Sequence, residues 1–413
     1  MKAEIISVGT ELLLGQILNT NSKYLSERLA ELGINVYTHT TVGDNSERLR
    51  QAFNNAADRV NLIITTGGLG PTGDDITRET LSAFLNLPLE ISAEEADRIQ
   101  QHFKRRGLEW VDSNSKQAAF FPGSVFLKNE VGTAPGLALK GSDYSFILLP
   151  GPPNEMQLMF SKYAVPWMKN NIMDPAILPL HSMILKFMGI SESKLENILE
   201  DLFRNQTEPT LALYAKTGEI QLRITARAQS SAHFQQLIQP SLDEIMKRAA
   251  QYLTAVNEET LAVTLMRILK ERNLTVSTAE SCTGGIVSSL FTANPGSSQY
   301  YVGSVIAYSN EIKTKLLDIP AKLIQEHGAV SPQVAEAMAE GIKNKTGSAI
   351  GIGITGIAGP GGGTSEKPVG LVYIAVNTPE QKICTSHKLT GNRETIRQRA
   401  AITALHQLWK LIR

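Results

Sequence analysis

The stretch Ala279-Glu280-Ser281-Cys282-Thr283-Gly284-Gly285 lies between two apolar segments in the C-terminal part of the chain. Residues 274–276 before it are typical of a short strand, and residues 286–291 after it have the apolar spacing of a helix. The sequence therefore predicts a strand–turn–helix junction with a hydroxyl at the turn, where free N–H groups can hold a phosphate or an oxyanion. A Ser/Thr-rich helix cap with glycines for tight packing fits the same pattern.

The composition predicts a folded protein of two or three domains. The chain has 413 residues, 42% of them hydrophobic and 19% charged, and its 40 basic residues balance its 40 acidic residues. This balance gives no broad attraction to nucleic acid or to anionic membranes. No apolar run reaches membrane-spanning length, and Glu4 and Glu11 interrupt what would be a signal peptide. We expect a cytoplasmic location.

The cysteines and histidines indicate neither a disulfide framework nor a zinc site. Cys282 and Cys384 are the two cysteines, far apart in the sequence, and the seven histidines are scattered.

Strands and helices alternate in the N-terminal part. Apolar runs at residues 5–8, 34–37 and 62–66 predict strands, and residues 21–32 and 46–58 predict helices. Short links between them favour a parallel sheet with helices on both faces.

The third of these strands leads into Gly67-Gly68-Leu69-Gly70-Pro71-Thr72-Gly73-Asp74-Asp75. In such sheets ligands bind beyond the carboxyl ends of the strands, and glycines let backbone approach a phosphate closely. Two adjacent acids are suited to a hard cation that bridges phosphate oxygens. We therefore favour a phosphate and metal loop over the alternative, in which one Asp only caps the next helix.

Two more loops have the same character. Residues 129–136 include Gly132 and Thr133, and residues 150–155 end at Glu155. With the first loop they predict one shared pocket.

The region from residue 173 to 255 has a different pattern of predicted elements. Pro175 and Pro179 mark a linker, and the rest predicts a small α+β unit with no catalytic group of residues. Its basic side chains are typical of a solvated face, so we do not expect nucleic-acid binding.

A second group of reactive side chains follows Ser281. Ser298 precedes a strand predicted at residues 302–307, and Tyr308 and Lys313 follow it. An ordinary lysine is no base at neutral pH, but burial lowers its pKa, and a neutral Lys313 would then accept the serine proton. A surface lysine on an amphipathic helix fits the same spacing.

Alternative chemistry uses the same segments. Glu280, Lys313 and Cys282 are the residue types of a nitrilase-like amidase, in which the thiol attacks. If Lys313 is not the base, Tyr308, Glu280 and His327 are the other candidates.

Two C-terminal features suit an anion. The loop Thr355-Gly356-Ile357-Ala358-Gly359-Pro360-Gly361-Gly362-Gly363 offers backbone N–H groups to a phosphate, although a mobile surface loop has the same composition. Arg393 and Arg397 share one face at the start of the last helix, where cations oppose the helix dipole unless an anion is near.

Four N-terminal segments, GTELLLGQILNTNS, TTGGLGPTGDD, VGTAPG and LPGPPNEM, resemble the CinA family (competence/damage-inducible protein A). This part also resembles molybdopterin-binding domains. The resemblance implies a pyrophosphatase that acts on ADP-ribose and needs a divalent metal (Mg, Mn or Co). It implies metal ligands at Asp74, Asp75 and Glu155, and substrate contacts from Gly67, Gly68, Gly70, Thr72, Gly132, Thr133, Asn19 and Glu11.

The C-terminal strings TAESCTGG, YSNEIK, HGAVS, GITGIAGPGGG and KPVG are similar to the CinA C-terminal domain, a nicotinamide-mononucleotide deamidase without a cofactor. The resemblance implies Ser281 as nucleophile and Lys313 as its partner, with Ser298 and Tyr308 in proton handling or positioning. It also implies oxyanion N–H groups at Gly284 or Gly285, and substrate contacts from Thr283, Gly356, Gly359, Gly361 and Arg397.

We therefore expect an α/β protein with two three-layer α/β/α domains, at residues 1–172 and 256–413, joined by a small α+β KH-like domain at residues 173–255. Its partners should be small-molecule nucleotides and a second copy of the chain, with no membrane. Two rival functions are a non-enzymatic regulatory protein linked to DNA uptake or damage, and a molybdopterin-handling enzyme.

Overall fold

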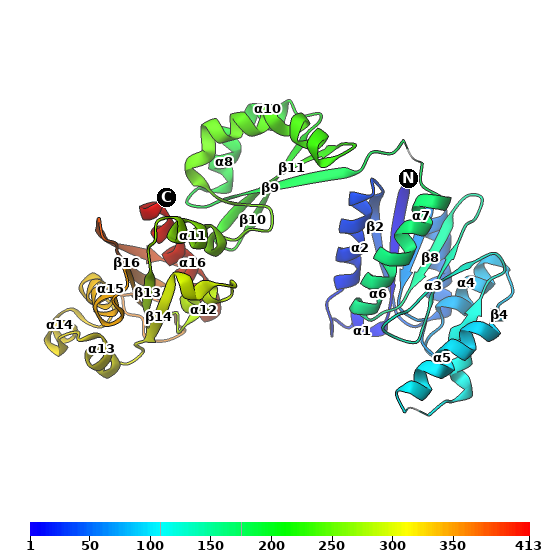
Figure 1. Cartoon of the computed structure of the whole chain (residues 1–413), viewed down its shortest axis with the longest axis horizontal. Coiled ribbons are helices and arrows are strands. Elements are labelled where there is room, and N and C mark those ends of the chain that lie inside the picture. The colour runs from blue at the N-terminus through cyan, green and yellow to red at the C-terminus, as the bar shows by residue number, and fades with distance from the viewer. Residues whose placement is uncertain (108, 175) are drawn as a thin grey trace. The chain divides into compact units, whose positions relative to one another are not determined.

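The computed structural model describes residues 1–107, 109–174 and 176–413, so that Pro175, one of the two expected linker prolines, lies outside the described residues. The chain divides into two compact units (Figure 1). One unit holds Met1–His181 with Ala226–Leu237, and the other holds Ser182–Thr225 with Ile238–Arg413. Most of the expected middle domain therefore groups with the C-terminal part.

The N-terminal unit is built on a mixed sheet. Its strands are β1 (Lys2–Val8), β2 (Asn35–Val42), β3 (Leu62–Thr66), β6 (Val125–Leu127), β7 (Gly136–Leu139) and β8 (Ser145–Leu149). The strand order is β2-β1-β3-β8-β7-β6, and a separate small pair joins β4 (Glu90–Ile91) to β5 (Ala119–Phe120).

The parallel arrangement expected for the first three strands is confirmed, and the sheet adds antiparallel strands at one edge. Strands β1, β2, β3 and β8 are parallel, but β7 runs antiparallel to β8, and β6 runs antiparallel to β7. The links around β7 are shorter than the dozen or so residues that a crossover between parallel strands needs.

Helices cover both faces of this sheet, as expected. Leu49 and Phe53 of α3 and Leu81 of α4 pack on one face, and Leu25 of α2 and Met156 of α6 pack on the other. The helices are α1 (Thr10–Leu13), α2 (Thr20–Glu31), α3 (Ser46–Ala57), α4 (Thr77–Leu85), α5 (Ala93–Arg105), α6 (Pro153–Met159) and α7 (Val165–Asn171).

The middle part is a small α+β unit. Its sheet has the order β10-β11-β9-β12, formed by β9 (Leu180–Phe187), β10 (Thr210–Lys216), β11 (Glu219–Arg227) and β12 (Leu253–Val256). Its helices are α8 (Glu192–Ile198), α9 (Glu200–Arg204) and α10 (Ser231–Ala249). The buried Leu199 leaves the helical conformation and separates α8 from α9.

The C-terminal part has three layers. Its strands are β13 (Val276–Glu280), β14 (Tyr301–Ile306), β15 (Ile350–Gly356), β16 (Leu371–Asn377) and β17 (Lys382–Lys388), in the order β14-β13-β15-β16-β17. Its helices are α11 (Leu261–Glu271), α12 (Ile286–Thr292), α13 (Asn310–Leu317), α14 (Ala321–His327), α15 (Pro332–Thr346) and α16 (Arg393–Ile412).

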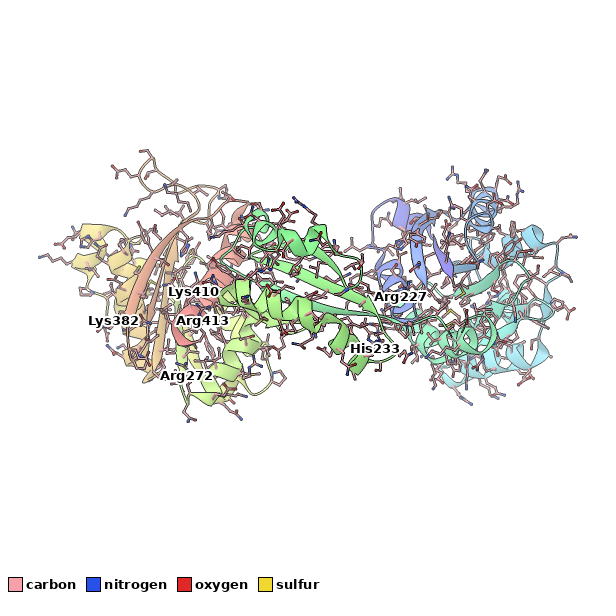
Figure 2. The ribbon with its side chains drawn as sticks, turned by 90° about the horizontal axis from the view of Figure 1, so that it is seen from above. Arg227, His233, Arg272, Lys382, Lys410 and Arg413 are labelled. Atoms are coloured by element: carbon pink, nitrogen blue, oxygen red, sulfur yellow. The ribbon has the colours of Figure 1, made fainter. Side chains whose placement is uncertain are left out.

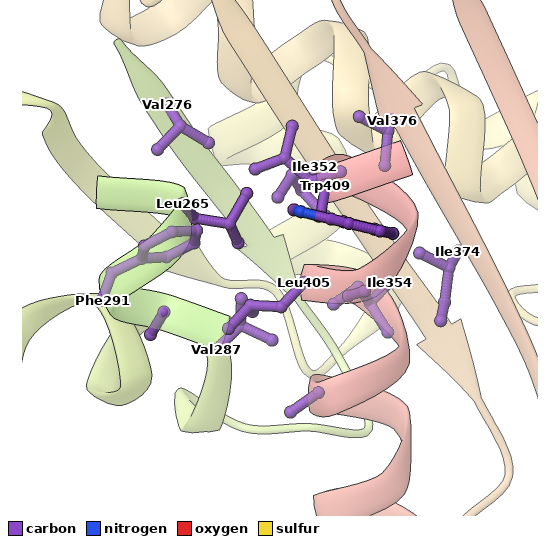
Figure 3. Close-up of a cluster of buried hydrophobic side chains, with 14 of the residues drawn as sticks. Leu265, Val276, Val287, Phe291, Ile352, Ile354, Ile374, Val376, Leu405 and Trp409 are labelled. Carbon is purple, nitrogen blue, oxygen red and sulfur yellow. The ribbon is translucent and has the colours of Figure 1, made fainter. Parts of the chain in front are cut away.

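Each face of this sheet has its own core. On one face, Leu265 of α11, Phe291 of α12 and Trp409 of α16 pack over Ile352 and Ile374 of the sheet (Figure 3). On the other face, α13, α14 and α15 pack over Ala279 of β13. The middle part also contacts α16, because Arg413 at its end donates to the Gln251 carbonyl (Figure 2).

The topology brings several loops to one edge of the sheet. Strands β13, β14 and β15 are parallel, so their carboxyl ends meet there. Strand β17 is antiparallel to β16, which is antiparallel to β15, so β17 also ends at this edge, where α16 begins. Strand β13 runs through Glu280 rather than ending at Val276, because its polar residues Ser277 and Thr278 are buried and hydrogen-bonded.

Candidate functional site

Ser281 and Lys313 form a close pair at this edge. Ser281 directly follows β13, and Lys313, only 1% exposed, lies on α13. The Lys313 Nζ donates to Ser281 Oγ at 3.2 Å, to the Ala307 carbonyl at 2.8 Å and to the Tyr308 carbonyl at 3.3 Å. Burial lowers the pKa of Lys313 from its ordinary value of 10.5. The alternative of a surface lysine is therefore wrong.

Three acceptors match the three N–H donors of a protonated lysine, and the same arrangement also accommodates the neutral amine that proton transfer requires. A neutral lysine has two N–H donors and one lone pair. The two carbonyls accept the two donors, and the lone pair then faces the Ser281 hydroxyl. The pair is thus arranged for proton transfer from Oγ to Nζ.

Cys282 is directed away from this pair. Its side chain is buried in the apolar core with Val287 and Phe291, and burial raises the pKa of its thiol to about 11. A thiol with that pKa is almost fully protonated at neutral pH and is a poor nucleophile.

The buried Glu280 caps the N-terminus of α12. Its Oε2 accepts from the N–H groups of Gly285 at 2.9 Å and Val287 at 3.2 Å, and its Oε1 accepts from the N–H of Ser288 at 2.8 Å. The carboxylate therefore satisfies donors that a helix start leaves free. Because Glu280 is committed to these three N–H groups, the contacts argue against its acting as the acid of a nitrilase-like group.

This cap also affects the N–H groups of Gly284 and Gly285, which we expected to bind the oxyanion. The N–H of Gly285 is bonded to Glu280, and the N–H of Gly284 donates to the Ser281 carbonyl at 3.2 Å. Neither N–H is free to bind a substrate oxyanion while the turn keeps this geometry, so the expectation that one of them does so is not supported.

Arg397 holds the serine turn instead of facing open space. Its Nε donates to the Cys282 carbonyl at 3.1 Å and its Nη2 donates to the Thr283 carbonyl at 2.8 Å. Thr283 is fully buried, and its Oγ1 has no hydrogen-bond partner among the described residues. Gly284 has a φ of +59°, and a Cβ there would lie 3.0 Å from Arg397 Nη2. Arg397 is therefore a positioning residue for the turn.

Arg393 contacts the glycine-rich loop, whereas Arg397 contacts the serine turn. The Nη1 of Arg393 donates to the Gly359 carbonyl at 2.6 Å and its Nη2 donates to the Tyr308 hydroxyl at 3.0 Å. Arg393 thus joins the glycine-rich loop to Tyr308, whose side chain is 62% exposed. The sequence signal for an anion site here was the pair of cations, Arg393 and Arg397, at the start of α16, where the helix dipole disfavours positive charge.

The glycines of this loop have different roles. A Cβ on Gly356 would lie 2.8 Å from the Leu371 carbonyl, so Gly356 allows close packing of β15 against β16. Gly361 has no atom within 4 Å of its Cβ position and is open to a ligand. Thr355 donates its hydroxyl hydrogen to the Ala329 carbonyl.

The structure does not bring Ser298 to this site. Ser298 lies in a short turn before β14, and β14 begins beside Val276, the first residue of β13. Ser281 follows the other end of β13, so the strand length of roughly 15 Å separates the two serines. The sequence alone does not show which end of β14 lies beside Ser281.

A cavity of about 350 Å³ at the carboxyl edge of the N-terminal sheet unites the three predicted loops. It is lined by Gly67, Gly68 and Gly70 of the first loop, Thr133 of the second, and Gly151 and Glu155 of the third. Five carboxylates line it: Glu11, Asp44, Asp74, Asp75 and Glu155. Sequence reasoning missed Asp44, because β2 was expected to end at residue 37 and in fact ends at Val42.

Thr72 and Asn129 hold two of these carboxylates by hydrogen bonds, and Gly132 leaves room for one of them. Thr72 donates its N–H and its hydroxyl to Asp75 Oδ2, at 3.0 and 2.5 Å. Glu155 accepts from Asn129 Nδ2 at 2.7 Å, and a Cβ on Gly132 would lie 2.2 Å from Glu155 Oε2.

A buried arginine also holds these loops. Arg78 donates from Nη1 to the Leu69 carbonyl at 2.9 Å and from Nη2 to the Pro135 carbonyl at 2.7 Å. Burial lowers the pKa of Arg78 to about 10.

The acidic lining fits a hard divalent cation that a phosphate helps to hold. Among the residues that the structure describes, no three His, Cys, Asp or Glu side chains form a ready metal-ligand group. Magnesium commonly needs only one or two carboxylates together with substrate phosphates and water. Carboxylates alone would repel a phosphate, so the cavity requires a cation before it suits an anionic substrate.

Asn19 lies beside this cavity rather than in its lining. It caps α2, where its Oδ1 accepts from the Ser22 N–H at 3.0 Å and its Nδ2 donates to Ser7 Oγ at 2.9 Å. It lines a neighbouring cavity of about 300 Å³.

Three family models match the chain in sequence. Residues 4–170 match the probable molybdopterin binding domain, residues 182–255 match the damage-inducible protein CinA KH domain, and residues 258–412 match the CinA C-terminal domain. A CinA-like protein of Dictyoglomus thermophilum is 48% identical over 405 residues, which cover 98% of each chain. The chain belongs to the CinA family. A CinA-like protein of Kosmotoga olearia is 45% identical over 405 residues, covering 98% of this chain and 97% of its own.

A solved structure covers one part of this CinA-family chain. The competence/damage inducible protein CihA of Agrobacterium tumefaciens is 35% identical and covers 37% of this chain and 93% of its own, with a TM-score of 0.36. Within the described part of the CinA-family chain, no helix has the length and apolar character needed to cross a membrane.

Proposed function

We propose that the C-terminal domain hydrolyses the carboxamide of nicotinamide mononucleotide to nicotinate mononucleotide and ammonia. The observation that carries the proposal is the 3.2 Å contact between Ser281 Oγ and the buried Lys313 Nζ. The family resemblance supplies the substrate and its amide bond, and the contact supports attack by a serine hydroxyl on a carbonyl carbon.

The reaction follows from the groups in place. Ser281 Oγ attacks the carboxamide carbon while Lys313 Nζ takes the hydroxyl proton. The tetrahedral intermediate collapses as Lys313 gives that proton to the amide nitrogen, which leaves as ammonia. Water, deprotonated by Lys313, then hydrolyses the ester on Ser281 and releases the carboxylate product. The cationic pyridinium of the substrate further lowers the pKa of Lys313, because like charges disfavour the ammonium.

The nucleotide phosphate would lie between Arg393 and the open part of the glycine-rich loop at Gly361. Arg393 already bridges this loop and Tyr308, and its guanidinium is suited to fork onto phosphate. In this arrangement Arg397 acts only on the serine turn.

The test is to incubate the full chain with nicotinamide mononucleotide and to measure ammonia and nicotinate mononucleotide together. Equal amounts of both products support the proposal. Absence of both from folded protein would contradict it and would favour a regulatory role without catalysis.

For the N-terminal domain we propose hydrolysis of the pyrophosphate of ADP-ribose. The observation that carries this proposal is the cavity lined by three glycines of one loop and five carboxylates. A bound divalent metal would neutralise the phosphates and orient a water, and Asp74 and Asp75 would hold it. Both proposed substrates arise from the breakdown of NAD, which gives a reason for the fusion of the two domains.

Release of AMP and ribose 5-phosphate from ADP-ribose tests this second proposal. The rival function is molybdopterin handling, which the matched family model keeps open. Pterin fluorescence released from the purified protein on denaturation, without ADP-ribose hydrolysis, would favour that rival.

A further inference from the structure

Strand β14 is an uncovered edge of the C-terminal sheet. It stands at the end of the strand order, so among the described residues only β13 pairs with it. Its sequence, Tyr-Val-Gly-Ser-Val-Ile, contains no charged residue and no proline. Two of its large apolar side chains are exposed, Val302 at 49% and Ile306 at 52%. An exposed edge strand of this kind is a template for pairing with another strand.

The opposite edge of the same sheet is protected. Strand β17 begins at Lys382 and ends at Lys388, with His387 beside the second lysine, and Lys382 forms an ion pair with Glu340. Charged side chains on an edge strand oppose the approach of another strand, because pairing would remove their charges from water. Strand β14 lacks this protection.

The pattern of β14 suits a second copy of the same strand. In antiparallel pairing about a two-fold axis at Ser304, each Val302 lies opposite the partner's Ile306, so that the exposed apolar side chains cover one another. The pairing of β13 with β14 is regular from Gly303 to Ile306, which leaves a regular edge for this contact. Gly303 has no atom within 4 Å of its Cβ position, so the space beside it is open. Because β14 has no charged residue, this pairing brings no like charges together.

This edge leads directly to the Ser281 site. A Cβ on Gly285 of the serine turn would lie 3.2 Å from Ile306 Cδ1. Two residues after Ile306, the Tyr308 carbonyl accepts from Lys313 Nζ, and Tyr308 is 62% exposed. A strand paired with β14 would therefore reach the rim of this site.

The same register brings an exposed turn of the partner to Tyr308. Tyr308 would lie opposite the partner's Tyr300, with their Cα atoms roughly 5 Å apart. The turn Ser297–Gln299 comes directly before Tyr300, and its Ser298 and Gln299 are exposed. Ser298 is remote from Ser281 within one chain, but this pairing would place it beside the site of the partner.

We propose that β14 is the interface between two copies of the chain, and that each copy supplies Ser298 and Gln299 to the rim of the other copy's Ser281 site. The hydroxyl and amide groups of these side chains would hydrogen-bond polar groups of the bound nucleotide. The shared site rests on the proposed deamidation, whereas the interface does not.

The association of the full chain in solution tests the interface. Sedimentation velocity over a range of protein concentrations gives the dissociation constant of the dimer. Val302→Lys places a charge in the paired edge, and the matched control Val125→Lys makes the same change at a 50% exposed position of β6, an edge strand of the N-terminal sheet. We expect a dimer for the unaltered chain and for Val125→Lys, and at least about tenfold weaker association for Val302→Lys. A monomeric unaltered chain, or a dimer that responds equally to both variants, would overturn the interface.

Mixing two impaired variants tests the shared site. Ser281→Ala keeps the turn at Ser298, whereas the double variant Ser298→Ala/Gln299→Ala keeps Ser281. We expect the double variant alone to raise the KM for nicotinamide mononucleotide about tenfold, because substrate contacts are lost. After the two variants are mixed in equal amounts and exchange chains, half of the Ser281 sites obtain an intact turn from a partner. Activity below KM should then rise to roughly half that of the unaltered protein per Ser281 site.

The outcomes of the two experiments are distinct. Exchange of chains is verified by energy transfer between differently labelled copies. Full activity of the double variant alone, or no gain of activity although the chains exchange, would overturn the shared site. A dimer with the expected response to Val302→Lys, but no deamidation by the unaltered chain, would support the interface and reject both the shared site and the proposed deamidation.

Discussion

Lys313 Nζ lies 3.2 Å from Ser281 Oγ, although 32 positions separate the two residues in the sequence. They meet because β13 and β14 are parallel neighbours and end at the same edge of the sheet. Ser309 caps α13 by accepting from the Ile312 N–H, which starts the helix at the position from which Lys313 reaches back to the serine turn.

The pH profile of deamidation should rise with the deprotonation of Lys313. Burial lowers the pKa of Lys313 from 10.5, and only the neutral amine accepts the serine proton. Activity should therefore increase as the pH rises through this lowered pKa. Lys313→Arg keeps the charge but does not deprotonate, so it should lose roughly 100-fold or more in kcat. Turnover of both proteins between about pH 6 and 10 is the measurement. If Lys313→Arg stays within a few fold of the unaltered chain, Lys313 is not the base.

The lowered pKa of Lys313 should also make the free energy of unfolding depend on pH. The folded state binds the Lys313 proton more weakly than the unfolded chain does, so stability rises with pH from the lowered pKa up to 10.5. Each unit by which burial lowers the pKa corresponds to about 1.4 kcal/mol across that window. Lys313→Met removes this dependence.

We therefore expect the free energy of unfolding of the unaltered chain to rise relative to that of Lys313→Met as the pH increases toward 10.5. Denaturant unfolding at several pH values measures it. The matched control is Lys315→Met, on the exposed side of the same helix, where Lys315 pairs with Glu311. Parallel pH curves for the unaltered chain and Lys313→Met would contradict the lowered pKa.

Ser281→Ala should reduce deamidation by about 10³-fold or more, because it removes the attacking atom. Cys282→Ala should keep activity within about tenfold and should cost roughly 1 kcal/mol of stability, because Cys282 is a core residue. Ammonia release under saturating substrate and a thermal melt measure the two effects. The reverse ranking of the two variants would restore the thiol as nucleophile.

Glu280→Gln should destabilise the serine turn. Three N–H groups point at the Glu280 carboxylate, and an amide offers one oxygen to them and turns an NH₂ group toward the rest. We expect a loss of about 1–3 kcal/mol in stability and a lower kcat. Glu311→Gln makes the same change in an exposed ion pair with Lys315 and should have little effect. A Glu280→Gln protein as stable and active as the Glu311→Gln control would show that the cap is unimportant.

Removal of metal should separate the two activities. A chelator should abolish ADP-ribose hydrolysis and leave deamidation unchanged, because the Ser281 site uses its own side chains. Asp74→Asn should lower the ADP-ribose activity roughly 100-fold. Asp143→Asn is the control, since Asp143 lies before β8, at the opposite edge of the same sheet. Hydrolysis of ADP-ribose that persists in thorough chelator would reject the role of the metal.

Local patterns in the sequence predicted most elements of the fold. The apolar run at residues 62–66 coincides with β3, and the apolar spacing of residues 286–291 coincides with α12, because hydrophobic periodicity reports directly on buried faces. The predicted end of β13 was wrong because Ser277 and Thr278 are polar but buried, with hydrogen bonds to distant residues. Composition does not show such bonds, so the strand was expected to end too early.

The sequence by itself determined which features lie at strand ends: a serine turn, a lysine after the next strand, and glycine-rich loops with acids. These positions follow from the sequence because strands and turns depend on neighbours along the chain. Only the tertiary structure decided that Ser281 and not Cys282 faces Lys313, and that Glu280 caps α12. It also decided that Ser298 lies at the far edge and that Arg393 reaches the loop and Tyr308. The physical reason is that the direction of a side chain at a turn depends on backbone angles and on packing, and the order and direction of strands set which loops meet.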